Sequence, residues 1–240
     1  MWTTWNPWHG CRKLSPGCAN CYMYRIDERY ERDPTQIAKT SNYLLPLARR
    51  RDGSYKIEPG SNVFTCGSSD FFLAEADEWR IDAWNAIRLR PDLKFLIITK
   101  RIDRFETNLP ADWGDGYPQV EIACTCENQQ MADLRLPIFL KAKIAKKSVV
   151  CEPLLERINL LDHLKSGGIR SLIAGGESGP NARPCDFEWV LNLRAQCAES
   201  KVSFNFKQTG ANFKKDGRTY KIPKLKQGAQ ARKSGIDLNF

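Results

Sequence analysis

Short apolar segments separated by helical stretches recur along this chain and constrain its fold more than any other feature. The segments are 62–66, 94–99, 120–124, 148–151, 171–174 and 202–206. As a group they lack the regular polar alternation of a strand with one face in water, so they are expected to be buried on both faces. Buried strands that alternate with helices predict an α/β fold with a parallel sheet.

Helical stretches are predicted at 21–33, 75–90, 129–136, 160–165 and 187–199. In the second of these, Trp79, Ala83 and Ile87 fall on one face. Pro91 is expected to end that helix and Pro137 the next. About six strand–helix units indicate a partial (β/α) TIM-type barrel. A flat doubly wound sheet is the alternative, because spacing alone does not separate the two.

The 240 residues suit one domain with a short appendage. We expect residues 1–210 to form the barrel, with the N-terminal cysteine-containing loop as part of it. Residues 211–240 are predicted to be an irregular basic extension that folds back over the sheet or contacts a partner. Its basic residues are Lys214, Lys215, Arg218, Lys221, Lys224, Lys226, Arg232 and Lys233.

Composition narrows the location and the partners. No run of about 18 apolar residues is present, and the N-terminus lacks a signal peptide's basic and apolar segments, so we expect a cytoplasmic protein without a membrane span. Nine cysteines, an odd number in a reducing compartment, argue for ligand or reactive roles rather than a disulfide framework. The net charge of +9 fits a nucleic acid, a phosphorylated substrate or an acidic electron-donor protein.

Polar clusters follow almost every predicted strand. In parallel α/β proteins ligands bind beyond the carboxyl ends of the strands, so these clusters are expected to form one site. The alternative is that strand ends are polar because they are exposed. The candidates are Ser68, Ser69, Asp70, Lys100, Arg101, Thr125, Glu127, Asn128, Glu152, Gly175, Gly176, Glu177 and Lys207.

A cysteine triplet, Cys11, Cys18 and Cys21, precedes the first long strand with the spacing C-x6-C-x2-C. Pro16 and Gly17 can fold the intervening chain so that three thiolates converge. Three interpretations compete. A structural zinc site needs four ligands, with His9 as the fourth. Buried thiols need no metal, but such cysteines seldom lie in a loop rich in Gly, Pro and Asn. A [4Fe–4S] cluster on three cysteines leaves one iron open for S-adenosylmethionine.

Several motifs resemble one known family, the phage-associated three-Cys-motif proteins, which are regarded as radical SAM-like. The matching segments are Thr4–Pro7, Ser15–Tyr22, Ser69–Phe72, Leu96–Arg101, Glu127–Asn128, Cys151–Leu155, Gly175–Pro180, Ala182–Pro184 and Phe206–Gln208. The resemblance covers nearly the whole chain. It implies a partial TIM-type barrel with a cluster at its open end. The spacing departs from the C-x3-C-x2-C loop of mainstream radical SAM enzymes, and Thr209 stands where relatives often carry Trp.

Roles follow for the candidate residues. The resemblance implies that Ser68, Ser69 and Asp70 lie where radical SAM barrels hold the amino group of the cofactor. Glu127 and Asn128, next to Thr125, suit ribose hydroxyls, because a carboxylate accepts several hydrogen bonds. Gly175 and Gly176 offer backbone contact. The expected catalytic side chains are Lys100, Glu152, Glu177 and Lys207. The two lysines are expected either to hold an anionic substrate or to pair with the two carboxylates.

The predicted function is therefore a radical SAM enzyme that carries a [4Fe–4S] cluster and S-adenosyl-L-methionine. It would cleave the cofactor reductively to a 5′-deoxyadenosyl radical and modify a nucleotide, a nucleic-acid base or another anionic substrate. A reductant protein such as a flavodoxin or ferredoxin is the expected partner. The alternative is a zinc- or cluster-stabilised nucleic-acid-binding protein without radical catalysis.

Overall fold

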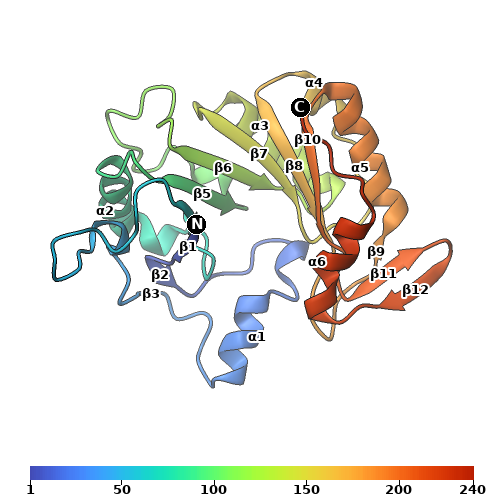
Figure 1. Ribbon diagram of the computed structural model, residues 1–240, viewed down its shortest axis with the longest axis horizontal. Coiled ribbons are helices and arrows are strands. Elements are labelled where there is room, and N and C mark those ends of the chain that lie inside the picture. Colours follow the sequence, from blue (N-terminus) through green and yellow to red (C-terminus); the bar gives the residue numbers. More distant parts are fainter. The chain divides into compact units, whose positions relative to one another are not determined.

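The computed structural model describes residues 1–240 as a mixed α/β fold built on a seven-stranded parallel sheet (Figure 1). In the order in which they neighbour each other, its strands are β1 (Trp2–Trp5), β4 (Asn62–Thr65), β5 (Lys94–Thr99), β6 (Val120–Thr125), β7 (Lys146–Cys151), β8 (Ile169–Gly175) and β10 (Ser203–Gln208). This order is compatible with the partial (β/α) barrel that the sequence predicts.

All six predicted strands are confirmed to within about two residues at each end, because the apolar runs that define them are local. The seventh strand, β1, was not predicted. It pairs in parallel with β4, from Trp2 opposite Asn62 to Trp5 opposite Thr65. The side chain of Trp5 is fully buried, and its indole N–H donates to the carbonyl oxygens of Asn42 and Tyr43. Its sequence, Trp-Thr-Thr-Trp, lacks the apolar run that marks the other strands, so only the tertiary burial of Trp5 reveals it.

Two compact units divide the chain. Unit 1 comprises residues 1–12, 26–123 and 141–146, and unit 2 comprises residues 13–25, 124–140 and 147–240. In unit 1 a short antiparallel pair, β2 (Trp8–His9) and β3 (Ala38–Lys39), precedes β4, and helix α2 (Asp77–Arg88) connects β4 to β5. An aromatic cluster forms much of its core: the ring centroids of Phe71 and Trp84 lie 4.8 Å apart, and those of Trp84 and Trp113 lie 4.9 Å apart.

Unit 2 contains the strands from β7 onward. Its helices are α3 (Gln129–Lys141), α4 (Leu161–Lys165), α5 (Phe187–Ser200) and α6 (Lys224–Lys233). Only the last residue of α3, Lys141, belongs to unit 1. A small sheet of β12 (Arg218–Lys221), β11 (Asn212–Lys215) and β9 (Cys185–Asp186) lies beside α5 and α6 in Figure 1. Helix α1 (Tyr22–Arg29) begins in unit 2 and ends in unit 1.

Two predictions about regular structure were wrong. Pro137 does not end its helix, since α3 continues to Lys141. The continuation buries Phe139 completely. Pro137 has no N–H to donate to the carbonyl of Asp133 one turn earlier, but both residues are exposed, so water can bind that carbonyl. Burial of the apolar face therefore outweighs the missing hydrogen bond.

The C-terminal extension is regular rather than irregular. It forms the hairpin β11–β12 and helix α6. The hairpin turn at Asp216 and Gly217 has both residues at left-handed φ, 50° and 72°, as an Asp-Gly turn between two strands requires. Phe213 packs on Phe187 and Phe206, with ring centroids 5.6 and 6.1 Å apart. These contacts give the extension a core that composition does not reveal.

Replacement of Gly176 by Ala is expected to destabilise the protein, because the ends of β8 and β10 approach closely there. A Cβ on Gly176 would lie 2.3 Å from the carbonyl oxygen of Thr209 and 2.8 Å from Cβ of Cys185. We expect Gly176→Ala to cost about 3 kcal/mol of unfolding free energy in urea titrations. Gly228→Ala in α6 is the matched control, because its nearest neighbour would be the flexible Arg232 side chain at 3.4 Å. Gly228→Ala is expected to gain up to about 1 kcal/mol of unfolding free energy, because Ala favours a helix more than Gly does. An equal loss in both variants would contradict the close approach at Gly176.

Candidate metal centre

Exposure separates the three cysteines of the triplet from the other six. Cys11, Cys18 and Cys21 are half-buried, whereas the remaining six are buried. Cys11 follows β2 in unit 1. Cys18 closes the single turn Pro16–Cys18 in unit 2, and Cys21 directly precedes α1. The backbone N–H of Cys21 donates to the carbonyl of Cys18 at 3.3 Å, so these two cysteines belong to one compact turn.

In unit 1 the carboxylate of Asp70 connects the ends of β4 and β5. It is buried and accepts hydrogen bonds from the hydroxyl of Thr99 at 2.8 Å, from the backbone N–H of Lys100 at 2.9 Å and from that of Phe72 at 3.0 Å. The guanidinium of Arg101 completes the set at 3.4 Å. Asp70 therefore holds Arg101 in place.

Arg101 in turn contacts the segment that carries Cys11. Its Nη2 donates to the carbonyl oxygen of Arg12 at 2.6 Å, and its Nη1 lies 3.9 Å from Sγ of Cys11. A guanidinium beside a thiol favours the thiolate, which is the form that binds a metal. Arg101 thus positions this segment and places its guanidinium beside the thiol of Cys11.

Ser68 and Ser69 also contact this segment. The hydroxyl of Ser69 donates to the carbonyl oxygen of Gly10 at 2.5 Å, and that of Ser68 donates to the carbonyl of Trp8 at 3.4 Å. The backbone N–H of Ser68 donates to Oδ1 of Asn6 at 3.2 Å. The structure thus places both serines against the chain that leads to Cys11.

In unit 2 Glu127 holds the turn before Cys18. Its side chain is fully buried. One carboxylate oxygen accepts from the hydroxyl of Ser15 and, at 3.1 Å, from the backbone N–H of Gly17. The other oxygen accepts from Nη1 of Arg135 at 2.6 Å. Arg135 also donates to the carbonyl of Thr125, the last residue of β6, at 2.7 Å, so this residue, helix α3 and the cysteine turn are joined through Arg135 and Glu127.

Gly17 is needed for this close approach. A Cβ at this position would lie 2.9 Å from the carboxyl carbon of Glu127, nearer than real side chains come. Gly17 is therefore required because no side chain fits between the turn and Glu127.

Glu177 holds the same turn on its other side. Its carboxylate accepts from Nδ2 of Asn20 at 2.9 Å, and Asn20 lies between Cys18 and Cys21. Arg183 adds a backbone bond at 2.8 Å and two guanidinium bonds at 2.9 and 2.5 Å. Asn20 also donates to the carbonyl oxygen of Asn181 at 2.8 Å. Two buried carboxylates at strand ends thus fix the Cys18–Cys21 turn.

The environment of Glu177 favours its charged form. Burial by itself would raise the pKa of the carboxyl, but the hydrogen bonds from Arg183 and Asn20 outweigh burial and hold the pKa below its ordinary value. The same pair raises the pKa of Arg183 above its ordinary value, chiefly through its hydrogen bond to Glu177. Both partners are therefore charged in the folded protein at neutral pH.

The other cofactor-binding candidates contact the protein itself. Oδ1 of Asn128 accepts from the backbone N–H of Met131 at 2.9 Å and so caps the start of α3. The N–H of Gly176 donates to the carbonyl of Gln208, and the carbonyl of Gly175 accepts from Leu154. The hydroxyl of Thr125 is buried and has no hydrogen-bond partner, which makes it the orphaned polar group of this strand end.

Glu152 and Lys207 form a separate pair in unit 2, at the ends of β7 and β10. Nζ of Lys207 lies 2.8 Å from Glu152, whose other oxygen accepts from Nε2 of Gln208 at 2.6 Å. More than half of the Lys207 side chain is exposed. No hydrogen bond ties this pair to the cysteine turn, unlike Glu127 and Glu177. The side chain of Lys100 is half-buried, and its backbone N–H is bound to Asp70.

The buried cysteines differ chemically from the triplet. Burial raises the pKa of the Cys151 thiol well above its ordinary value, and raises those of Cys185 and Cys197 to about 12. A thiol must lose its proton to bind a metal. These side chains are therefore poor ligands and serve as small core residues.

His9 is already engaged within unit 1. Its Nε2 lies 2.7 Å from Oδ2 of Asp27, which is fully buried. Only Nδ1 is left for a further partner. Neither unit by itself gathers three or more His, Cys, Asp or Glu side chains that could hold a metal ion.

The sequence does not indicate Asn20, Arg135 and Arg183 as residues that hold the cysteine turn. Asn20 and Arg183 belong to segments with no periodic pattern. Arg135 carries a usable signal, because it lies on the same helical face as Ala132, Leu136 and Phe139, all of which are buried. A charged residue on a buried face needs an opposite charge, here Glu127.

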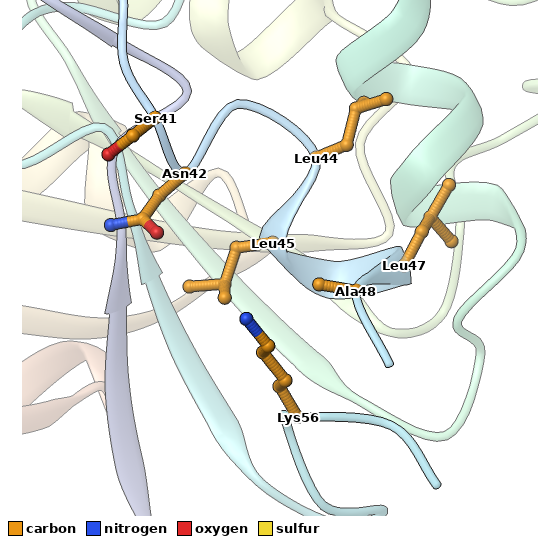
Figure 2. A pocket seen from close by; sticks show the side chains of 7 residues that line it. All are labelled: Ser41, Asn42, Leu44, Leu45, Leu47, Ala48 and Lys56. Carbon is orange, nitrogen blue, oxygen red and sulfur yellow. The ribbon is translucent and has the colours of Figure 1, made fainter. Parts of the chain in front are cut away.

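A hollow of about 340 Å³ lies elsewhere in unit 1. Figure 2 shows the side chains that line it. Its lining is mostly apolar and comes from the excursion between β3 and β4: Ser41, Asn42, Leu44, Leu45, Leu47, Ala48 and Lys56. None of the candidate site residues lines it. The hollow therefore plays no part in the site described above.

Replacement of Glu177 by Gln is expected to loosen the cysteine turn. At pH 7 the variant should lose about 2 kcal/mol of unfolding free energy, the size of a hydrogen-bond loss involving charged groups. Since the folded pKa lies below the unfolded value of about 4.3, this contribution is complete above that value and is lost as the pH falls through the folded pKa. Urea titrations of Glu177→Gln and the native chain should therefore converge in acid.

Glu199→Gln is the control for this measurement, since Glu199 pairs with Lys165 at 2.5 Å but both side chains are about half exposed. It should cost less than about 1 kcal/mol. A loss in Glu177→Gln that does not change with pH would contradict the assigned charge.

Comparison with known proteins gives a family without a known activity. No curated protein and no solved structure matches the chain. None of the helices combines the length and the apolar character needed to span a membrane. Residues 1–237 match the family described as "Protein of unknown function (DUF5131)". The chain therefore belongs to that family.

Proposed function

We propose that this protein is a radical SAM-type enzyme in which Cys11, Cys18 and Cys21 hold a [4Fe–4S] cluster. It would cleave S-adenosyl-L-methionine reductively and modify a nucleotide or a nucleic-acid base. The observation that carries the proposal is the Cys18–Cys21 turn, whose position is fixed on one side by Glu127 and on the other by Glu177.

Two buried carboxylates are a costly way to hold a surface loop. Taking such a charge out of water is unfavourable unless it is paired, and each is paired here with an arginine. Metal sites use this kind of support, because groups behind the ligands set ligand orientation and affinity. The arrangement therefore supports a ligand role for Cys18 and Cys21.

The donor set fits a cluster better than zinc. A closed zinc site takes four ligands, and the nearest nitrogen candidate, His9, already binds Asp27 through Nε2. The six remaining cysteines are buried. Three half-exposed thiols within eleven residues instead suit a cluster with one iron left open.

Bound there, a reduced cluster would supply one electron to the sulfonium of S-adenosyl-L-methionine, which yields methionine and a 5′-deoxyadenosyl radical. The chain's own residues have simpler tasks. Arg101 offsets the negative charge of Cys11, while Glu127 and Glu177 position the turn. Lys207 is proposed to contact an anionic substrate, because its ammonium group is largely exposed beside Glu152.

Anaerobic reconstitution with iron and sulfide tests the proposal. The native chain is expected to bind about four irons and four sulfides. With dithionite and S-adenosyl-L-methionine it should release 5′-deoxyadenosine, measured by liquid chromatography and mass spectrometry. Cys11→Ala, Cys18→Ala and Cys21→Ala should each lose the cluster and the product. Cys197→Ala, a change at a buried cysteine of α5, should keep both.

Other results would replace the proposal by a different function. One zinc and no iron per chain would identify a zinc-stabilised binding protein. Iron whose spectrum does not respond to S-adenosyl-L-methionine, with no 5′-deoxyadenosine formed, would identify a structural or redox-sensing cluster.

A further inference from the structure

Positive charge is concentrated in the C-terminal thirty residues. Residues 211–240 hold eight basic and two acidic side chains, so they carry a net charge of +6 of the chain's +9. The two acidic residues are Asp216 and Asp237. The remaining 210 residues are almost balanced. The charge is thus a property of this segment rather than of the whole protein.

All eight basic side chains are exposed, and almost none is neutralised. They are Lys214, Lys215, Arg218, Lys221, Lys224, Lys226, Arg232 and Lys233. Only Lys214 forms an ion pair, with Asp186 at 3.1 Å. Seven cations on one segment therefore lack a carboxylate partner, in contrast to the buried arginines of the candidate site.

The segment is folded onto unit 2 and holds these groups in place. Helix α6 buries Gln227 and Ala231, and the carbonyl of Gln227 accepts from the backbone N–H of Thr209, just beyond β10. The N–H of Ile222 donates to the carbonyl of Ala211, which joins the hairpin to the start of α6. Figure 1 shows α6 against β10 and beside the hairpin. The basic groups are thus presented by ordered elements.

Strand β12 is the outer strand of its small sheet, and all four of its residues are exposed. Arg218 and Tyr220 are alternate residues of this strand, so their side chains share one face, and Lys215 of β11 lies opposite Arg218 on the same face. The side chain of Tyr220 is 43% exposed. An exposed aromatic ring beside two cations offers a base a stacking surface and offers its phosphates a counter-charge.

We propose that the hairpin β11–β12 and helix α6 bind single-stranded nucleic acid, with phosphates on the basic side chains and a base on Tyr220. That single-stranded nucleic acid is the substrate rests on the proposed function, but its binding to this surface does not require the cluster. The attachment of α6 to β10 also connects this surface to Lys207, the proposed substrate contact, since a Cβ on Gly228 would lie 3.5 Å from the carbonyl of Lys207.

An acidic electron-donor protein is the competing occupant of a basic surface. Such a partner would use the cations but has no need of an exposed ring beside them. Bases supply flat π-faces that stack on Tyr, whereas carboxylates do not. The position of Tyr220 therefore favours nucleic acid.

Fluorescence anisotropy with a labelled single-stranded DNA of about 20 nucleotides tests the surface on the full chain. Affinity should fall steeply with salt, with a slope of about −0.7 per phosphate contact in log K against log salt. The triple variant Lys215→Gln, Arg218→Gln, Lys221→Gln should bind at least tenfold more weakly and lose about two units of slope. Tyr220→Ala should bind about tenfold more weakly with the slope unchanged, because stacking releases no counterions.

A matched triple variant controls for net charge. Arg51→Gln, Lys94→Gln, Lys141→Gln removes three exposed cations that have no ion pair and lie outside the C-terminal segment, and it should bind like the native chain. Equal weakening in both triple variants would overturn the proposal. So would tighter binding of the same sequence as a duplex, together with no effect of Tyr220→Ala. If the triple variant of the C-terminal segment bound DNA like the native chain but its cluster were reduced more slowly by flavodoxin, the surface would be assigned to the electron donor instead.

The two proposals fail in different ways. Anisotropy is measured with or without iron, so loss of 5′-deoxyadenosine formation leaves the binding result intact. A chain that forms 5′-deoxyadenosine but binds no DNA would overturn only this inference.

Discussion

Burial of a carboxylate beyond the end of a strand, with an arginine to neutralise it, is the interaction on which the cysteine segments depend. Glu127 follows β6 and Glu177 follows β8, each by two residues, and each accepts hydrogen bonds both from its arginine and from the segment that carries Cys18 and Cys21. Asp70 does the same in unit 1 through Arg101. The buried charge is tolerable only while all partners are present, so turn, strand end and arginine are stabilised together.

This arrangement changes the roles that residue chemistry suggests. A carboxylate after a buried strand is a natural ligand-binding group, and Glu127 and Glu177 are predicted from the sequence to contact cofactor or substrate. Their oxygens accept hydrogen bonds from the protein, so we propose that they position the turn for the cluster, and their contact with a cofactor or substrate stays a prediction. Glu152 differs, because its partners Lys207 and Gln208 come from a neighbouring strand end and one of them is largely exposed. We therefore propose Glu152 as the carboxylate that contacts a substrate.

Local patterns predict much of the fold and propose a ligand set, whereas long-range contacts are hidden. Apolar runs locate six strands because burial on both faces leaves a direct mark on composition. The spacing of Cys11, Cys18 and Cys21 is equally local. The helix through Pro137 and the order of residues 211–240 depend on burial of Phe139 and Phe213 against distant residues, which no window of sequence reports. Asn20 and Glu177 are likewise 157 positions apart.

The two kinds of charge in this protein act over different distances. In the candidate site each buried charge is cancelled within hydrogen-bond reach, so little field extends outward. Around β12 and α6 the cations are uncompensated and solvated, and their attraction extends over a Debye length of about 8 Å at physiological salt. Charge of this second kind suits capture of a polyanion, and charge of the first kind suits rigid placement of ligands. Helix α6 rests on β10, and Lys207 lies at the end of that strand. A nucleic-acid strand bound at the basic surface would therefore be held beside the proposed substrate contact rather than at a remote site.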